Sequence, residues 1–514
     1  MFSKVKSCAV HGVDGRMIDV EADVNDGLPV FTMVGYLSSS VREASERVRT
    51  ALKNSGFHLP PKRITINLSP ADMRKDGSGY DLAIATAVLL SLGVTAELPM
   101  EQTLVLGELS LDGSIKAIPG VLPMVICARE EGMTSCIVPK ENVQEAALVQ
   151  GISVIGVSSL QETMEYIQGI KEYENKNVEQ PAVDTSEYLY DIDFSDVVGQ
   201  ESIKRGMEIA AAGFHNVLLT GAAGAGKSML AKRLPTILPQ MSFEESLEVT
   251  KIYSVGGMLP PEGGLIHRRP FRAPHHTISE YALIGGGRVP TPGEVSFAHY
   301  GVLFLDELPE FSKPVLEVLR QPLEDRRIRI SRVQASYEFP ADFMFVAAMN
   351  PCPCGNYPDY RRCSCTEQQI RRYQSKVSGP LLDRIDIRME VKGVKQEALF
   401  SRQKTESSKT IRARVEQARQ MQKKRFAGTG RLFNSQLDGK NLEEYITLSA
   451  EGKRLVLQLF EEQELSVRGV HRILKLARTI ADLAGSEEIE HAHLQEAAFY
   501  RNQDVFAKEV LYGN

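Results

Sequence analysis

Residues 221–228 of this sequence, GAAGAGKS, fit the pattern G-x-x-x-x-G-K-[ST] at every fixed position, and the apolar run 216–220 leads into them. Glycine tolerates positive φ, so we expect Gly221, Gly224 and Gly226 to turn the backbone and aim successive N–H groups at phosphate oxygens. The Lys227 ammonium would neutralise the β and γ phosphates, and the Ser228 hydroxyl would bind Mg²⁺. The residues that we expect to contact a nucleotide here are Gly221, Ala222, Ala223, Gly224, Ala225, Gly226, Lys227, Ser228 and Met229.

Two adjacent carboxylates, Asp306 and Glu307, follow a second apolar run of strand length, residues 301–305. In a parallel sheet this strand would finish beside the strand that precedes residue 221. Asp306 would then join the Mg²⁺ shell, and Glu307 would polarise the attacking water. Taken singly, the loop also fits an ordinary glycine-rich turn, and the pair fits an exposed acidic turn. Their succession along the chain favours the catalytic interpretation.

Two more apolar runs complete a set of strands. Residues 343–349 end at Asn350, whose amide can hydrogen-bond the γ phosphate or the lytic water, and residues 385–391 form the fourth run. Segments of helix length separate these runs, which predicts an α/β core that hydrolyses a nucleotide.

Composition limits the class of protein. The chain has 514 residues, 43% of them hydrophobic, which is enough for about three domains with real cores. The formal net charge of −6 means that any contact with nucleic acid must come from local basic patches. The N-terminus lacks the apolar core of a signal peptide, and the longest apolar run, residues 82–92, is too short to cross a bilayer. We therefore expect a cytoplasmic protein without membrane contact.

The pattern along the chain divides it into parts. Residues 1–168 alternate strand-like runs (63–68, 103–106, 136–138) with helical periodicity (40–55, 80–92, 120–131), and predict one α/β domain. Residues 169–191 are polar and aperiodic, as in an exposed linker. The nucleotide core would occupy residues 192–394, and the basic helical periodicity of residues 395–514 predicts a helical lid.

On these motifs the sequence resembles the AAA+ ATPases, and within them the magnesium-chelatase-like YifB/ComM family, over nearly the whole chain. Residues 193–200, DFSDVVGQ, are similar to the segment that lines the adenine pocket, with Val197, Val198 and Gly199 nearest the base. Residues 270–294 resemble the family's insert in the second helix of the core. His275 and His276 in this insert have no acidic or thiol partner at helical spacing, so we interpret them as part of a polar loop rather than a metal site.

The resemblance also assigns two arginines. Arg384, in the sequence LLDRID, matches the arginine finger that reaches the γ phosphate bound by the neighbouring subunit, and Arg468 matches the second sensor arginine of the lid. It therefore implies a ring of identical subunits, most simply a hexamer. An arginine supplied in trans accelerates comparable NTPases by ~10³ to 10⁵. Ordinary surface salt bridges are the alternative for both residues.

The amino-terminal domain resembles the proteolytic domain of Lon, a fold like that of ribosomal protein S5. Gly79 occupies the position of the nucleophilic serine, Ser78 lies one residue earlier, and Lys116 matches the general-base lysine. A lysine without its serine cannot form an acyl-enzyme, so we expect this domain to be inactive as a protease and to serve binding or assembly.

Four of the seven cysteines form two C-x-C pairs, in an insertion at residues 352–365. The thiolates of Cys352, Cys354, Cys363 and Cys365 could close a tetrahedral Zn²⁺ site. The alternative is a reduced, solvent-facing loop. The other cysteines, Cys8, Cys127 and Cys136, lie in apolar runs and are expected in the core.

Basic residues gather in three groups. They are Arg326, Arg327, Arg329 and Arg332 beside a predicted hairpin at residues 327–339; Arg361, Arg362, Arg371, Arg372 and Lys376; and Arg412, Arg414, Arg419, Lys423, Lys424 and Arg425. Contacts from such residues to phosphates would be independent of sequence and sensitive to salt, although solvated helix surface fits the third group equally well.

Together these features predict an ATP- and Mg²⁺-dependent homo-oligomeric motor that acts on single-stranded or branched DNA. The resemblance implies a helicase that promotes branch migration during recombination and natural transformation. Two alternatives are a chelatase-type ATPase that remodels a protein partner and an ATP-dependent protease like Lon. The protease is disfavoured because Gly79 occupies the position of the nucleophilic serine.

Overall fold

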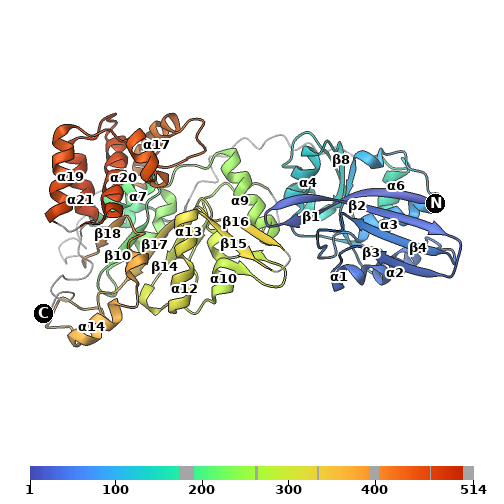
Figure 1. Ribbon diagram of the computed structural model, residues 1–514, viewed down its shortest axis with the longest axis horizontal. Coiled ribbons are helices and arrows are strands. Elements are labelled where there is room, and N and C mark those ends of the chain that lie inside the picture. The colour runs from blue at the N-terminus through green and yellow to red at the C-terminus, as the bar shows by residue number, and fades with distance from the viewer. Residues whose placement is uncertain (173–189, 261–263, 333–334, 394–404, 463–464, 502–514) are drawn as a thin grey trace.

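The computed structural model describes residues 1–172, 190–260, 264–332, 335–393, 405–462 and 465–501. A mixed-sheet domain at the amino-terminal end and a helical lid at the opposite end flank a domain built on a parallel sheet (Figure 1). Most of the predicted linker (173–189), the last residue of the predicted core (394) and the predicted start of the lid (395–404) lie outside the described residues. Among the described residues, no helix combines the length and the apolar character needed to cross a membrane.

The amino-terminal domain has a seven-stranded sheet in the order β3-β4-β2-β1-β5-β8-β9. Its strands are β1 (Phe2–His11), β2 (Asp14–Asn25), β3 (Val30–Val34), β4 (Arg63–Ser69), β5 (Thr103–Val105), β8 (Ser135–Pro139) and β9 (Ser153–Val157). Its longer helices are α2 (Ala44–Asn54), α3 (Asp81–Ser91), α4 (Val121–Glu130) and α6 (Leu160–Ile167). The predicted strands and helices of this domain are present, and α3 is buried on nearly all sides because it is apolar all round. The antiparallel pair β1–β2 was not predicted from the sequence.

The central domain is built on a five-stranded parallel sheet in the order β11-β14-β17-β10-β18. The strands are β11 (Phe271–Arg272), β14 (Val302–Leu305), β17 (Met344–Met349), β10 (Val217–Thr220) and β18 (Ile387–Glu390). Strands β10, β14 and β17 are buried at every position, because helices cover both faces of a parallel sheet. The four predicted core strands are therefore confirmed. Because the strands are parallel, the residues that follow β10, β14 and β17 meet at one edge.

The central domain carries several further elements. A two-stranded antiparallel hairpin pairs β15 (Arg327–Ser331) with β16 (Ser336–Pro340), as the sequence predicted. The insert between β11 and β14 forms α10 (Glu280–Ile284), a small hairpin of β12 (Gly285–Gly286) and β13 (Thr291–Pro292), and α11 (Glu294–Phe297). The other α-helices described in the domain are α7 (Glu201–Gly213), α8 (Lys227–Arg233), α9 (Phe243–Val255), α12 (Lys313–Val318), α13 (Arg320–Asp325), α14 (Glu367–Gln374) and α15 (Gly379–Leu382).

The two sheet domains touch along α4 and α9. Lys251 on α9 pairs with Asp14 at 2.9 Å, and Gly120 N–H donates to the carbonyl of Ser254 at 3.0 Å. The rings of His11 and Tyr337 stack with centroids 4.5 Å apart, so the β1–β2 hairpin reaches the β15–β16 hairpin (Figure 1).

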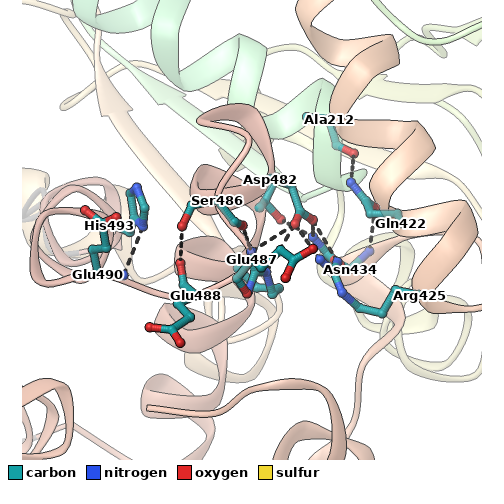
Figure 2. A network of polar contacts seen from close by, with 12 residues as sticks. Ala212, Gln422, Arg425, Asn434, Asp482, Ser486, Glu487, Glu488, Glu490 and His493 are labelled. Carbon is teal, nitrogen blue, oxygen red and sulfur yellow. Dashed lines mark hydrogen bonds and ion pairs between the residues drawn. The ribbon is translucent and has the colours of Figure 1, made fainter. Parts of the chain in front are cut away.

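The lid is helical, as predicted, and a buried polar network ties its helices together (Figure 2). Its main helices are α17 (Ser408–Arg425), α19 (Ala450–Glu462), α20 (Val467–Leu483) and α21 (His491–Arg501). Asp482 on α20 accepts two hydrogen bonds from the Arg425 guanidinium of α17, at 2.5 and 2.8 Å, and one from Asn434 at 2.8 Å. Gln422 on α17 donates to the Ala212 carbonyl of α7 at 2.9 Å, which joins the lid to the central domain.

Candidate functional site

The phosphate loop, residues 221–228, follows directly after β10 and leads into α8. Lys227 is buried, and its Nζ donates to the carbonyls of Gly221 and Ala222 at 2.7 and 2.9 Å. Burial lowers the pKa of the Lys227 ammonium, and the negative charges of Asp306 and Glu307 oppose that change. The loop therefore encloses the Lys227 ammonium, which backbone carbonyl oxygens hold in the neighbourhood of two carboxylates.

Glycine is required in the loop for two different reasons, positive φ at some positions and close backbone approach at another. Gly224 and Gly226 have φ of 76° and 94°, as predicted. The prediction was wrong for Gly221, which is not among the residues with positive φ. A Cβ at Gly221 would lie 2.2 Å from the carbonyl oxygen of Val391 just after β18, so close backbone approach excludes a side chain there.

The two carboxylates lie at the end of β14 beside the phosphate loop. The Ser228 hydroxyl donates to Asp306 Oδ2 at 2.5 Å, so the hydroxyl and the carboxylate that the sequence predicts as Mg²⁺ ligands lie side by side. Glu307 has a left-handed backbone (φ 52°, ψ 47°), which is strained for a residue with a side chain, and its carboxylate is exposed. These contacts fit the cation and water-activating roles predicted for Asp306 and Glu307.

Asn350 joins the same site from the end of β17. Its Oδ1 accepts from Lys227 Nζ at 3.0 Å. The ends of β10, β14 and β17 thus bring Lys227, Ser228, Asp306, Glu307 and Asn350 together at one edge of the sheet.

His276 also approaches this site, which the sequence did not predict. Its Nδ1 lies 4.0 Å from Glu307 Oε2, and its ring packs against those of His275 and Phe311. His276 follows β11, the neighbour of β14, so its place four residues after that strand was the available signal. Arg272 of the same insert forms a two-point ion pair with Glu294, with both contacts at 2.6 Å.

The predicted adenine segment lies next to the end of α8, where the Arg233 guanidinium donates to the Asp193 carbonyl at 2.8 Å. Asp193 caps the short helix Phe194–Asp196 by accepting from Ser195 N–H, and it also accepts from Ser408 N–H at the start of α17. Val197 is buried in the core, whereas Val198 and Gly199 are half-buried. Of the three residues, Val198 and Gly199 therefore have the more accessible surface for a base.

The two predicted arginines lie at the other edge of the sheet. Asn216, which precedes β10, donates its side-chain amide to the carbonyl of Arg384 at 2.9 Å, whereas the phosphate loop follows the opposite end of β10. Four residues of strand separate the two edges by about 13 Å. Arg384 and Arg468 both line one cavity of about 370 Å³, whose lining among the described residues includes none of residues 221–228.

Contacts around this cavity connect the segment that contains Arg384 and Asp386 to the lid. The Arg384 guanidinium donates to the Pro380 carbonyl at 2.8 Å and pairs with Glu324. The Asp386 carboxylate accepts a hydrogen bond from the guanidinium of Arg472 in the lid at 2.7 Å. Its other oxygen lies 3.3 Å from Nδ1 of His215. Burial would raise the pKa of Asp386, but the hydrogen bond from His215 and the charge of Arg472 outweigh it and hold the pKa well below its usual range. This link could not be predicted from the sequence, because its members are far apart along the chain.

The remaining predicted sites are placed as follows. The four cysteine sulfurs of the insertion lie within 4.8 Å of one another.

In the amino-terminal domain the Ser78 hydroxyl donates to Glu108, and Glu108 faces Lys116 across the β6–β7 pair (Glu108–Leu109 and Ile115–Lys116). A Cβ at Gly79 would contact Ile118 at 3.1 Å.

The three basic groups differ in their partners. In the first group Arg327 and Arg329 share Glu338, and in the third Arg414 and Arg425 lie in ion pairs. Arg419 is buried over the Phe433 ring. In the second group Arg361, Arg371 and Arg372 are exposed, and no described carboxylate pairs with them. Lys423 and Lys424 of the third group are exposed as well and form no described ion pair, so the second and third groups both have free cationic side chains.

Known proteins resemble the chain over nearly its whole length. Three families match the chain: "Magnesium chelatase, subunit ChlI" over residues 193–399, "Subunit ChlI of Mg-chelatase" over 20–142 and "Magnesium chelatase, subunit ChlI C-terminal" over 405–501. The chain is 41% identical to YifB of Escherichia coli over 507 residues, covering 98% of this chain and 97% of that protein. It is 41% identical to the competence protein ComM of Haemophilus influenzae over 503 residues, covering 97% of each. Lon protease 2 of Bacillus subtilis matches at 30% identity over 183 residues, 32% of each chain.

The family match and the nucleotide motifs make this chain an AAA+-type ATPase that uses ATP and Mg²⁺. The agreement extends over nearly the full length of the relatives and includes all three parts of the fold. The chain belongs to the magnesium-chelatase-like YifB/ComM family.

Proposed function

We propose that this chain forms a ring whose subunits complete one another's ATPase sites, and that the ring moves along single-stranded or branched DNA as a helicase. The observation that carries the ring is the position of Arg384 and Arg468 in one cavity at the sheet edge opposite the phosphate loop. An arginine side chain is shorter than the ~13 Å that separates the two edges, so neither residue is set to serve its own subunit's loop. Six subunits is the number that the family resemblance favours.

Within one subunit, the proposed roles follow from the contacts at the carboxyl ends of the strands. Ser228 and Asp306 would hold Mg²⁺, which supplies charge neutralisation at the phosphates when it is bound. Lys227 would exchange its backbone carbonyl partners for phosphate oxygens, and Asn350 would orient the γ phosphate or the water. Glu307 would accept the proton of the attacking water, because its exposed carboxylate directly follows Asp306 on a strained turn at the end of β14.

The partner subunit would supply the remaining charge. Arg384 is held by Glu324, an exposed carboxylate that lines the cavity, and the phosphates of a neighbouring site would replace that carboxylate. The stabilisation of transition-state charge by such an arginine accounts for ~10³ to 10⁵ in rate in comparable NTPases.

DNA binding rests on the second basic group. Arg371 and Arg372 on α14 and Arg361 on the cysteine insertion are exposed and unpaired among the described residues. Each phosphate contact that such residues make adds about 0.7 to the slope of log affinity against log salt for a single strand.

The test is the affinity for a forked DNA, and its stimulation of ATP hydrolysis, as a function of salt. We expect strong, salt-sensitive stimulation, and we expect the pair Arg371→Gln and Arg372→Gln to lower the salt slope by about 1.4. The pair Arg49→Gln and Lys53→Gln removes the same charge from the exposed face of α2 and should leave the slope unchanged. An ATPase indifferent to DNA at low salt would refute the proposal.

A second candidate is a motor that remodels a protein partner, which the three magnesium chelatase families favour. An ATPase that ignores DNA would support it. We propose that the amino-terminal domain is not a protease, since Gly79 offers no nucleophile and Ser78 is engaged by Glu108. Hydrolysis of casein by the purified protein would refute that part.

A further inference from the structure

The four cysteines of residues 352–365 form a compact cluster that the nucleotide chemistry does not use. All seven cysteines of the chain are described, and all are free thiols. Cys352 is fully buried, and the other three are half-buried rather than solvent-facing.

The separations in this cluster match a single tetrahedral metal site. The Cys352 sulfur lies 3.4 Å from that of Cys354 and 3.8 Å from that of Cys363, and the sulfurs of Cys354 and Cys363 are 3.6 Å apart. The Cys365 sulfur lies within 4.8 Å of the others. Four sulfurs placed about 2.3 Å from a central zinc ion lie about 3.8 Å from one another.

Hydrogen bonds around the cluster fix its shape. Tyr357 N–H donates to the Cys352 sulfur at 3.4 Å, and the Asn356 amide approaches the Cys354 sulfur at 3.9 Å. A tight turn links the Cys352 carbonyl to Gly355 N–H at 3.0 Å. Donors directed at sulfur are the outer partners that stabilise thiolate ligands.

The same loop lies against the phosphate loop. Gly355 has φ of 80°, and a Cβ built there would be 3.3 Å from the backbone nitrogen of Ala223 and 3.9 Å from the Asn350 side chain. Asn350 is separated from Cys352 by Pro351 alone, and the Pro351 carbonyl accepts from Gln374 of α14 at 2.9 Å. The cluster thus occupies the stretch of chain between Asn350 and α14, in contact with the loop that binds phosphate.

We propose that Cys352, Cys354, Cys363 and Cys365 bind one Zn²⁺ ion, and that this ion holds the 352–365 loop against Ala223 so that the nucleotide site is preformed. The second half of this statement rests on the nucleotide site described above. Each thiol loses a proton when the metal binds, and the closed set of four sulfur ligands makes the ion structural rather than catalytic. Thiolate sulfur in a tetrahedral arrangement selects zinc over the hard ions Mg²⁺ and Ca²⁺.

Metal analysis of the full-length protein tests the site itself. We expect about one zinc per chain in the wild type and in Cys127→Ser, a control that removes a half-buried thiol of α4, and none in the double variant Cys363→Ser, Cys365→Ser. Because the double variant could misfold, Co²⁺ is also added to metal-stripped wild-type protein, where four thiolates give the visible bands of tetrahedral cobalt. Wild-type protein without zinc and without those bands would overturn the proposal, as would iron with the absorption of an iron–sulfur cluster.

Binding of a fluorescent ADP analogue tests the coupling. If a tenth of the metal-free molecules hold the loop in place, removing zinc lowers the affinity for the analogue about tenfold, and adding Zn²⁺ restores that affinity. Equal affinity with and without zinc would overturn the coupling while the metal site stood. Failure of the nucleotide assignment is distinguishable, because the zinc-loaded wild type would then fail to bind the analogue at all.

Discussion

Replacing Asp482 by alanine should destabilise the packing of the lid helices α17 and α20 against each other. Asp482 is 2% exposed and accepts hydrogen bonds from Arg425 and Asn434 (Figure 2). It also accepts one from Arg478. Its removal leaves two guanidinium groups, one of them 3% exposed, without a carboxylate. Breaking a buried pair in this way costs about 3–5 kcal/mol.

At about 2–4 °C per kcal/mol, this loss lowers the melting temperature of the central domain and lid by roughly 6 to 20 °C. Differential scanning calorimetry measures the change, and the ATPase rate at low temperature should fall as well, because α20 also carries Arg468. Glu488→Ala removes an exposed carboxylate six residues further along and should leave the melting temperature within about 1 °C. A shift for Asp482→Ala no larger than that of Glu488→Ala would refute the assigned role of the network.

Three further predictions concern the nucleotide site. Glu307→Gln should bind ATP with wild-type affinity but hydrolyse it at least about a hundredfold more slowly, whereas Lys227→Ala should lose ATP binding itself. Normal turnover by Glu307→Gln in a steady-state assay would contradict the role assigned to Glu307. His276→Ala should lower kcat about tenfold at unchanged ATP affinity, because its ring lies 4.0 Å from the Glu307 carboxylate and helps to position it, and an unchanged kcat would contradict this. Gly221→Ala should abolish nucleotide binding by pushing the loop away from the Val391 carbonyl, and a variant that binds a fluorescent ATP analogue normally would show that the contact is not limiting.

The strands and the chemistry at their ends could be predicted from the sequence. Apolar runs that end in Asp306 or Asn350 carry both the strand signal and the functional group in one short segment, and parallel pairing then fixes which ends meet. The positive φ of Gly224 and Gly226 follows from the same local reasoning.

Contacts between distant segments could not be predicted. Arg425 and Asp482 are 57 residues apart, and His215 reaches Asp386 across 171 residues, so no periodicity connects them. Gly221 was assigned to a turn because the approach of Val391 from β18 is invisible until the sheet is built. The nearness of His276 to Glu307 likewise depends on the pairing of β11 with β14 rather than on any local pattern.

The central claim, that each ATPase site is completed by a neighbouring subunit, is tested most directly by mixing two inactive variants. Arg384→Ala keeps an intact phosphate loop, and Lys227→Ala keeps an intact arginine, so each alone should be inactive. In an equimolar mixture about a quarter of the interfaces pair an intact loop with an intact arginine, and ATP hydrolysis should recover toward that fraction of the wild-type rate. A mixture that stays inactive, or an Arg384→Ala protein that hydrolyses ATP at full rate alone, would contradict the account.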